Sequence, residues 1–196
     1  MTTERAYHHG NLRAALIERA WGVVDSDGAE GLSLRQLARD IGVSHGASAR
    51  HFRDKQALLD ALAVEGFRRL NSSLVDAAGS TGSYAERFRS AGDAYVAFAV
   101  AHPAILGVMY SAKHHSDASA ELVELSHLGM RALVALVEEG QASGEVRAGL
   151  AEQQALVAFA AVHGVATLAT DDLLNGVPWQ DAATATIAFV WSGLAA

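Results

Sequence analysis

Residues 33–52 read Ser-Leu-Arg-Gln-Leu-Ala-Arg-Asp-Ile-Gly-Val-Ser-His-Gly-Ala-Ser-Ala-Arg-His-Phe, and this stretch decides how the first third of the chain folds. The pattern predicts two short helices that meet at Gly42, because glycine takes a left-handed turn at little cost. Ala38 is small enough to let the two helices pack closely. Such spacing is typical of a helix-turn-helix, whose second helix stands out from the body and can enter a DNA major groove. The pattern alone also fits an ordinary pair of antiparallel helices.

Polar residues suited to cap helices occur at the start of this stretch, within it and directly after it. Ser33 and Gln36 have the spacing of a capping box, in which the serine hydroxyl accepts from the Gln36 amide and the Gln36 side chain reaches back. Ser44 is placed to cap the next helix and Asp54 the one after it. Further along, Ser83-Tyr-Ala-Glu86 has the same capping-box spacing.

Working outward, apolar residues recur at helical spacing almost everywhere, and no segment alternates with the period of a strand. We therefore expect an all-α protein of nine helices, over about residues 11–25, 33–41, 44–52, 54–76, 83–101, 103–110, 118–141, 151–174 and 179–194. The fourth helix shows helical periodicity without a linker before it, so it would connect two parts of the chain. We place a first domain at residues 1–53 and a second at residues 54–196.

Composition excludes several classes of protein. The 196 residues are 51% hydrophobic and 19% charged, which excludes intrinsic disorder. The chain has no cysteine, which excludes disulfides and metal sites built on thiolates. The net charge of −7 is uneven, because residues 1–70 carry ten basic and nine acidic side chains, whereas residues 71–196 carry five and thirteen. Only the first part is therefore suited to a polyanionic partner.

The longest uncharged run, Gln153–Thr170, contains Gln, His and Thr, and we interpret it as a buried helix and not a membrane span. The first residues lack the apolar stretch of a signal peptide. We expect a soluble, cytoplasmic protein.

Together with residues 11–25 before it and Arg50-His-Phe-Arg-Asp-Lys-Gln-Ala-Leu-Leu59 after it, the 33–52 block resembles the TetR family of one-component transcriptional regulators. The resemblance covers about residues 11–59. It implies that the first three helices bind DNA and that the others form a ligand pocket and a dimer interface. The His8-His-Gly-Asn-Leu-Arg start, His102-Pro-Ala and the His163-Gly pair further resemble a subgroup with a His-Gly pair in the eighth helix.

The resemblance also assigns roles to polar residues around the predicted third helix, although each could equally be a solvated surface side chain. We expect base edges to be contacted by Ser44, His45, Gly46 (through its backbone) and Ser48, and phosphates by Arg35, Arg50, His51 and Lys55. At the positions of Ala47, Ser48 and Ala49 the family usually has Thr or a small residue, an apolar residue and an aromatic one, so the chain departs from the pattern at Ser48 and Ala49. The missing aromatic side chain removes one backbone contact with DNA.

Two further surfaces are implied. Aromatic, sulfur and imidazole side chains on the fourth to eighth helices either fill the core or line a pocket for a small, largely apolar effector, namely Phe67, Phe88, Tyr95, Phe98, Met109, Tyr110, Met130 and His163. The last two helices carry little charge around their circumference, so a second copy of the chain would cover them. We expect this homodimer interface at Ala158, Ala161, Val162, Val165, Ala166, Ile187, Val190 and Trp191.

No pattern predicts catalysis, a metal or a cofactor. The nine histidines include no His-Glu-x-x-His run, and the chain lacks a Gly-x-Ser-x-Gly elbow and a phosphate-binding glycine loop. The expected function is a ligand-responsive transcriptional repressor that binds double-stranded operator DNA and leaves it when a small molecule binds. The alternative is a helical small-molecule-binding protein or enzyme whose DNA-binding helices have degenerated.

Overall fold

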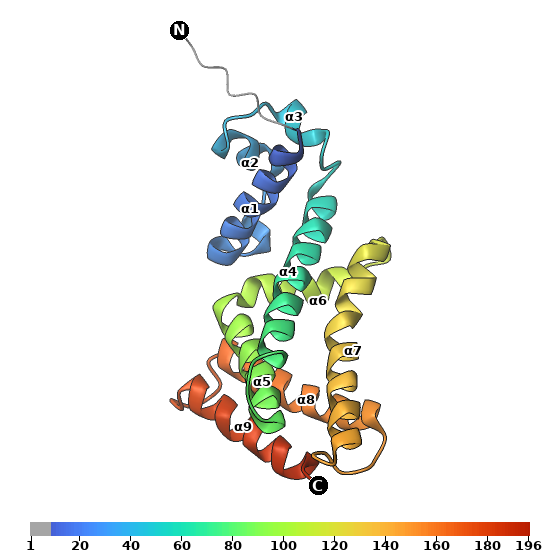
Figure 1. Ribbon diagram of the computed structural model, residues 1–196. Helices are drawn as coiled ribbons and strands as arrows, with labels where there is room; N and C mark the ends of the chain where they lie inside the picture. The colour runs from blue at the N-terminus through green and yellow to red at the C-terminus, as the bar shows by residue number, and fades with distance from the viewer. Residues whose placement is uncertain (1–8) are drawn as a thin grey trace. The chain divides into compact units, whose positions relative to one another are not determined.

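The computed structural model describes residues 9–196, with side chains from Leu12 onward, and is built of helices (Figure 1). The α-helices are α1 (His9–Asp27), α2 (Leu34–Asp40), α3 (His45–Ala49), α4 (Lys55–Ala78), α5 (Tyr84–Ala101), α6 (Pro103–Lys113), α7 (Ala120–Ser143), α8 (Ala151–Thr170) and α9 (Trp179–Leu194), with a 3-10 turn η1 (Ala29–Gly31). Over the described residues, β pairing is limited to an isolated antiparallel bridge between Val146 and Ala195. The predicted all-α fold of nine helices is confirmed.

Three of the four predicted caps form as expected. Ser44 Oγ accepts from the Ala47 amide at 3.2 Å, and Asp54 Oδ1 accepts from the Ala57 amide at 2.8 Å. At Ser83 both halves of the capping box are present. The largest boundary error is at α8, which ends at Thr170 and not at residue 174, because the chain turns there through Asp172 with a φ of 57°.

The helices pack in two compact units. The first unit runs to Gly66 and includes residues 104–122, and the second holds Phe67–Pro103 and Val123–Ala196. The division lies inside α4 and α7, later than the functional boundary that we predict after residue 53.

The core of the first unit is formed by α1, α2 and α3 with the first turns of α4 (Figure 1). Its fully or nearly fully buried side chains include Leu16, Ala20, Val24, Leu37, Ala38, Phe52, Leu58 and Leu62. The guanidinium of Arg13 on α1 lies 5.4 Å from the centroid of the Phe52 ring and covers one face of this core. The same unit contains the crossing of α4 and α6, where buried Gly66 lies against Met109.

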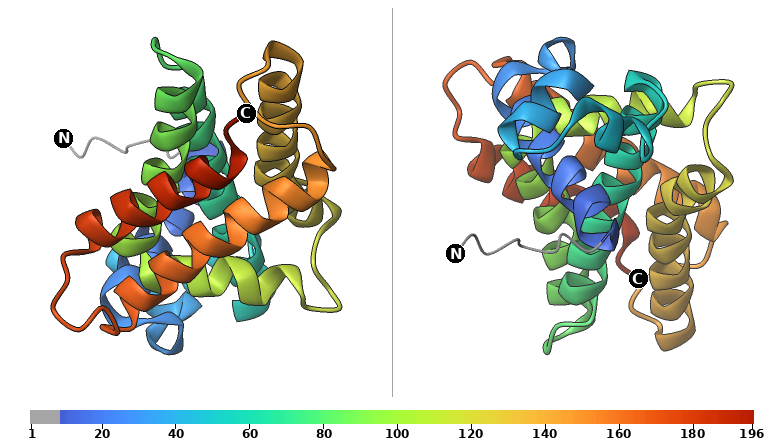
Figure 2. Two further views of the ribbon diagram at one scale, coloured as in Figure 1. Left: turned by 90° about the horizontal axis from the view of Figure 1, so that it is seen from below. Right: turned by 90° about the horizontal axis from the view of Figure 1, so that it is seen from above.

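In the second unit, α5 packs against α8 and α9, which lie side by side (Figure 2). The close approach of α5 and α9 requires a glycine, since a Cβ atom at Gly92 would lie 2.8 Å from Ile187. The Tyr84 hydroxyl donates to the Leu136 carbonyl at 2.6 Å and ties α5 to α7. Burial, assisted by the negative charge of Glu139, raises the pKa of Tyr84 to about 12.

By length and composition, helix α8 is apolar enough to cross a membrane. Only 28% of its most apolar stretch is buried inside the chain. Core helices of soluble proteins pass the same test. The prediction of a buried helix therefore holds for one face of α8, and the opposite face is exposed.

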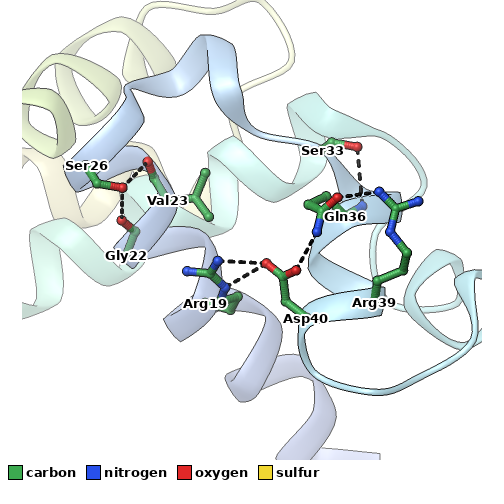
Figure 3. A network of polar contacts seen from close by, with 8 residues as sticks. All are labelled: Arg19, Gly22, Val23, Ser26, Ser33, Gln36, Arg39 and Asp40. Carbon is green, nitrogen blue, oxygen red and sulfur yellow. Dashed lines mark hydrogen bonds and ion pairs between the residues drawn. The ribbon is translucent and has the colours of Figure 1, made fainter.

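A polar network on the surface of the first unit ties α2 to α1 (Figure 3). Arg19 donates to Oδ2 of Asp40 through Nε at 2.8 Å and Nη2 at 2.7 Å. Gln36 donates to Oδ1 of Asp40 at 2.5 Å, while Arg39 donates to the Gln36 side-chain oxygen. The hydrogen bonds from Gln36 and Arg19 lower the pKa of Asp40.

This network corrects the predicted capping box at Ser33. Ser33 Oγ accepts from the Gln36 amide at 3.4 Å, as expected, but the Gln36 side chain points to Asp40 and does not return to the cap (Figure 3). The Gln36 side-chain oxygen accepts from Arg39 and its nitrogen donates to Asp40, and hydrogen bonds with charged partners are stronger than the one to the neutral Ser33 amide that a capping box requires.

We expect the substitution Asp40→Asn to lower the urea midpoint of unfolding at pH 7, because it removes the ion pair with Arg19. The folded-state pKa of Asp40 lies below the unfolded value of 3.8, so its stabilisation is present above that pH and is lost as the pH falls through the folded value. The difference between wild type and variant, followed by circular dichroism, should therefore shrink below pH 3.8. D76N, at an exposed aspartate on α4, serves as the control. A difference of constant size from pH 7 into the acid range would contradict this account.

The substitution Gly66→Ala should destabilise the protein. A Cβ at Gly66 would lie 2.6 Å from the Met109 sulfur, so the buried Met109 side chain or the two helices must shift, and overpacking of this kind costs about 1–3 kcal/mol. At Gly107 on α6 an added Cβ meets nothing within 4 Å, so G107A should instead stabilise by about 0.5–1 kcal/mol through helix propensity. Urea unfolding of both variants tests whether the two substitutions change stability in opposite directions. A stabilised G66A would disprove the tight packing of α4 against α6.

Candidate nucleic-acid interface

The turn between α2 and α3 has the geometry expected of a helix-turn-helix. Gly42 has a φ of 74°, the left-handed conformation predicted for it. The Val43 amide donates to the Ala38 carbonyl at 2.9 Å, which closes the turn over the small, buried Ala38 side chain. The chain then enters α3 through Ser44, which is extended as an N-cap residue should be.

Helix α3 presents a short outer face. His45, Gly46 and Ala49 are exposed, and Ala47 is half-buried. Ser44, predicted to contact a base, uses its hydroxyl as the acceptor for the Ala47 amide.

Ser48 does not lie on this outer face. Its side chain is 0% exposed, and its hydroxyl donates to the His45 carbonyl at 2.9 Å. The prediction that Ser48 contacts a base edge is therefore wrong in this structure. The residue lies one helical turn before the buried Phe52 and shares its inward face.

Exposed cationic side chains lie on the elements before and after α3. Arg35 on α2, Arg50 at the end of α3 and Arg53 before α4 are exposed, and His51 is half-buried. Lys55, predicted to contact a phosphate, donates to the Glu30 carbonyl at 3.2 Å and so helps to hold η1.

Arg53 is a candidate phosphate contact that sequence reasoning missed. Its Nε lies 3.1 Å from Oδ2 of Asp54, which also caps α4. The sequence contains a signal for this role, since Arg53 directly precedes the predicted cap Asp54 and therefore lies at the N-terminal end of a helix. Asp54 is thus both the cap of α4 and the ion-pair partner of the exposed Arg53.

A polar hollow of about 440 Å³ lies beside the end of α3, within the first unit. Its lining consists of Ala49, Arg50, His51, Arg53, Gln56, Ala57, Asp60 and Asp117. Asp60 Oδ1 accepts from the Ser119 amide at 3.1 Å. Asp60 and Asp117 line the same hollow as Arg50 and Arg53, so their carboxylates reduce the positive charge that the two arginines would offer a polyanion.

The residues predicted to line a ligand pocket are divided between the two units. Met109 and Tyr110 belong to the first unit, where Met109 packs against Gly66 and the Lys113 ammonium lies 4.6 Å from the Tyr110 ring centroid. The others belong to the second unit, namely Phe67, Phe88, Tyr95, Phe98, Met130 and His163. Phe88 packs 5.6 Å from the ring of Trp191 and is a core residue.

Two of these residues form a polar pair between α5 and α8. The Tyr95 hydroxyl lies 2.8 Å from Nδ1 of His163, and Phe159 stacks on the imidazole at 5.3 Å. This is the arrangement of a hydrogen-bonded core histidine, the alternative that the sequence left open. Asp93 on α5, which sequence reasoning did not consider, is half-buried, and burial raises the pKa of its carboxyl.

Most of the residues predicted to form the dimer interface face the interior of the chain. Six of the eight are already buried within one chain, namely Ala158, Val162, Val165, Ala166, Ile187 and Val190. Ala161 is half-buried, and half-buried Trp191 packs 5.6 Å from the Tyr84 ring. The physical reason is that α5 occupies this side of α8 and α9, and the small side chains allow that close packing.

The exposed faces of these two helices carry larger apolar side chains. Leu156, Val157 and Leu168 on α8 are exposed, and Phe189 on α9 is 81% exposed. Sequence reasoning missed them because both helices are apolar on all sides.

Within the described part of the chain, no three histidine or carboxylate side chains gather as metal ligands do.

Comparison with known proteins agrees with this geometry. Residues 16–62 match the family model described as "Bacterial regulatory proteins, tetR family", and residues 88–193 match "Tetracyclin repressor-like, C-terminal domain". Among curated proteins, the class D tetracycline repressor protein of Escherichia coli is 36% identical over 69 residues, which are 35% of this chain and 32% of that protein. The chain thus matches about a third of the length of this relative.

Solved structures extend the similarity to the whole chain. A protein of unknown function from Rhodococcus sp. RHA1 is 47% identical, with a TM-score of 0.91 over 98% of this chain and 100% of that one. A tetR-family transcription regulator, described as putative, from Shewanella sp. PV-4 shares the fold at 21% identity, with a TM-score of 0.67 over 94% and 98%. The match to the C-terminal family model alone covers more than half of the chain. The chain belongs to the TetR family of bacterial regulatory proteins.

Proposed function

We propose that this protein is a transcriptional regulator that binds operator DNA as a homodimer, represses transcription and leaves the DNA when a small molecule binds. The observation that carries the proposal is α3, a short helix with an exposed face beyond a left-handed Gly42 turn, with the exposed Arg35, Arg50 and Arg53 on the segments before and after it. Arginines placed before and after a protruding helix would bind phosphates and fix the helix in the groove. The proposed role is regulatory and not catalytic, and it places the protein with the DNA in the cytoplasm.

One observation favours the alternative of a small-molecule-binding protein with degenerate DNA-binding helices. Gly46 and Ala49 leave α3 with little side-chain bulk, and two carboxylates line the hollow beside it. The two functions differ in one measurable property, which is discrimination between operator and unrelated DNA.

The dimer part of the proposal rests on the exposed apolar side chains of α8 and α9. Leu156, Val157 and Phe189 are large apolar side chains exposed on the neighbouring helices α8 and α9, and monomeric proteins seldom leave a large apolar surface in water. Covering them with the same face of a second copy would form a two-fold interface of four helices. Two recognition helices, one from each copy, would then reach half-sites about 34–36 Å apart.

The effector part of the proposal rests on the second unit and on α4. Helix α4 is continuous from Lys55 to Ala78 and belongs to both units. A ligand bound among the helices of the second unit would therefore act on a helix that begins directly after the DNA-binding elements. The polar pair of Tyr95 and His163 would supply hydrogen-bonding groups in otherwise apolar surroundings.

We expect the protein to bind DNA from upstream of its own gene at least about 10³-fold more tightly than unrelated duplex, measured by fluorescence anisotropy. R50A should weaken binding to every duplex and reduce the slope of log affinity against log salt by about one, because it removes one phosphate contact. R89A, at an exposed arginine on α5, should change neither quantity. Equal, weak binding to all duplexes would favour the alternative function.

The substitution Val157→Glu should convert the dimer into a monomer, because Val157 is 65% exposed on α8 and a buried, unpaired carboxylate is costly. V75E is the matched control, since Val75 is 64% exposed on α4 in the same unit. Light scattering should give wild type and V75E twice the 20.5 kDa of one chain, and V157E that mass once. A wild-type monomer at micromolar concentration, or a V157E dimer, would rule out this interface.

A further inference from the structure

The structure leaves α3 few side chains with which to distinguish base sequences. The Ser44 hydroxyl is used as the helix cap, Ser48 is buried, and Gly46 has no side chain. Ala47 is half-buried. The side chains of α3 that remain exposed are those of His45 and Ala49, and the His45 imidazole makes no hydrogen bond within the described part of the chain.

These two side chains lie on one face of the helix. Residues four apart on an α-helix are neighbours, with Cβ atoms about 5–6 Å apart. Successive base pairs are about 3.4 Å apart along the DNA axis. His45 and Ala49 would therefore meet bases that are one or two pairs apart in the same half-site.

The chemistry of each side chain selects a base. An imidazole N–H is a donor, and guanine presents two neighbouring acceptors, O6 and N7, to the major groove, whereas the N7 acceptor of adenine lies beside an amino donor. A methyl group suits the C5-methyl of thymine. Because Gly46 and Ala49 add so little bulk, the helix backbone can approach the base edges closely enough for a single methyl to make contact.

We infer that His45 and Ala49 are the specificity-determining residues of α3, with His45 hydrogen-bonding to a guanine and Ala49 packing on a thymine methyl one or two base pairs away. This inference rests on the proposed function, because it names the bases that the same helix contacts. It differs from the sequence-based assignment, which divided base contacts among four residues that did not include Ala49.

Selection of wild-type protein on a pool of randomised duplexes tests the first part. The enriched sequence should contain, in each half-site, a guanine and a thymine at that spacing. Each thymine of the enriched duplex is then replaced in turn by deoxyuridine, which removes only the methyl group. Affinity should fall about fourfold at one thymine per half-site, the factor that corresponds to one buried methyl, and should not change at the others.

Variants of the protein assign each contact to its residue. In A49G the deoxyuridine penalty at that thymine should disappear, because the methyl partner is gone. H45A should lose about fivefold or more of the preference for guanine at its position and keep the deoxyuridine penalty. H127A, at an exposed histidine on α7, should behave as wild type in both assays. Thermal melts check that A49G is folded, and the deoxyuridine scan of wild type needs no variant.

The outcomes separate the two levels of the proposal. A pool that yields no enriched sequence would overturn the proposed function, and this inference with it. An enriched sequence without a sensitive thymine, or with a penalty that persists in A49G, would overturn the assignment of Ala49 and leave the proposed function standing. A guanine preference that survives in H45A would overturn the assignment of His45.

Discussion

A helix of five residues is not stable in water by itself, so α3 exists only because its surroundings hold it. Its inward face is fixed by the buried Ser48 and by Phe52 just beyond its end. Its first turn is satisfied by the Ser44 hydroxyl, and its direction is set by the left-handed Gly42. Every group that α3 could present to DNA depends on these few contacts. The network of Arg19, Asp40 and Gln36 belongs to the same support, since it ties α2 to α1 just before the turn.

Most of this local support could be predicted from the sequence, because it depends on residues close together in the chain. Gly42, Ser44, Asp54 and the complete capping box at Ser83 follow from rules about helix ends. The error at Gln36 came from a competition that the capping pattern does not contain. Gln36 lies three residues after Ser33 and four before Asp40, and its side chain donates to the Asp40 carboxylate instead of returning to Ser33. The error at Ser48 came from assigning it a base by its place in the predicted third helix, although its spacing from Phe52 places it inward.

The faces of α8 and α9 could not be predicted, for a different reason. Both helices are apolar all round, so periodicity does not distinguish the side that meets α5 from the side left outside. The predicted interface includes several small residues of α8, and these do mark close helix packing. That packing lies inside the chain, where Ala158 and Ala166 face inward and Gly92 lets Ile187 approach α5. The larger Leu156, Val157 and Phe189 are left on the outside.

The weak positive charge around α3 makes DNA binding depend on the proposed dimer surface of α8 and α9. Residues 1–70 have an excess of only one basic side chain, and Asp60 and Asp117 line the same hollow as Arg50 and Arg53. General attraction for phosphate is therefore weak, and a single recognition helix with few exposed side chains would add little to it. Linking two such helices makes the second binding event intramolecular, which raises the overall affinity without a new contact. The same linkage multiplies small differences between base sequences, because both half-sites must match. A weakly basic interface thus has a reason to be dimeric, and the exposed apolar side chains of α8 and α9 would serve the discrimination of DNA as directly as α3 does.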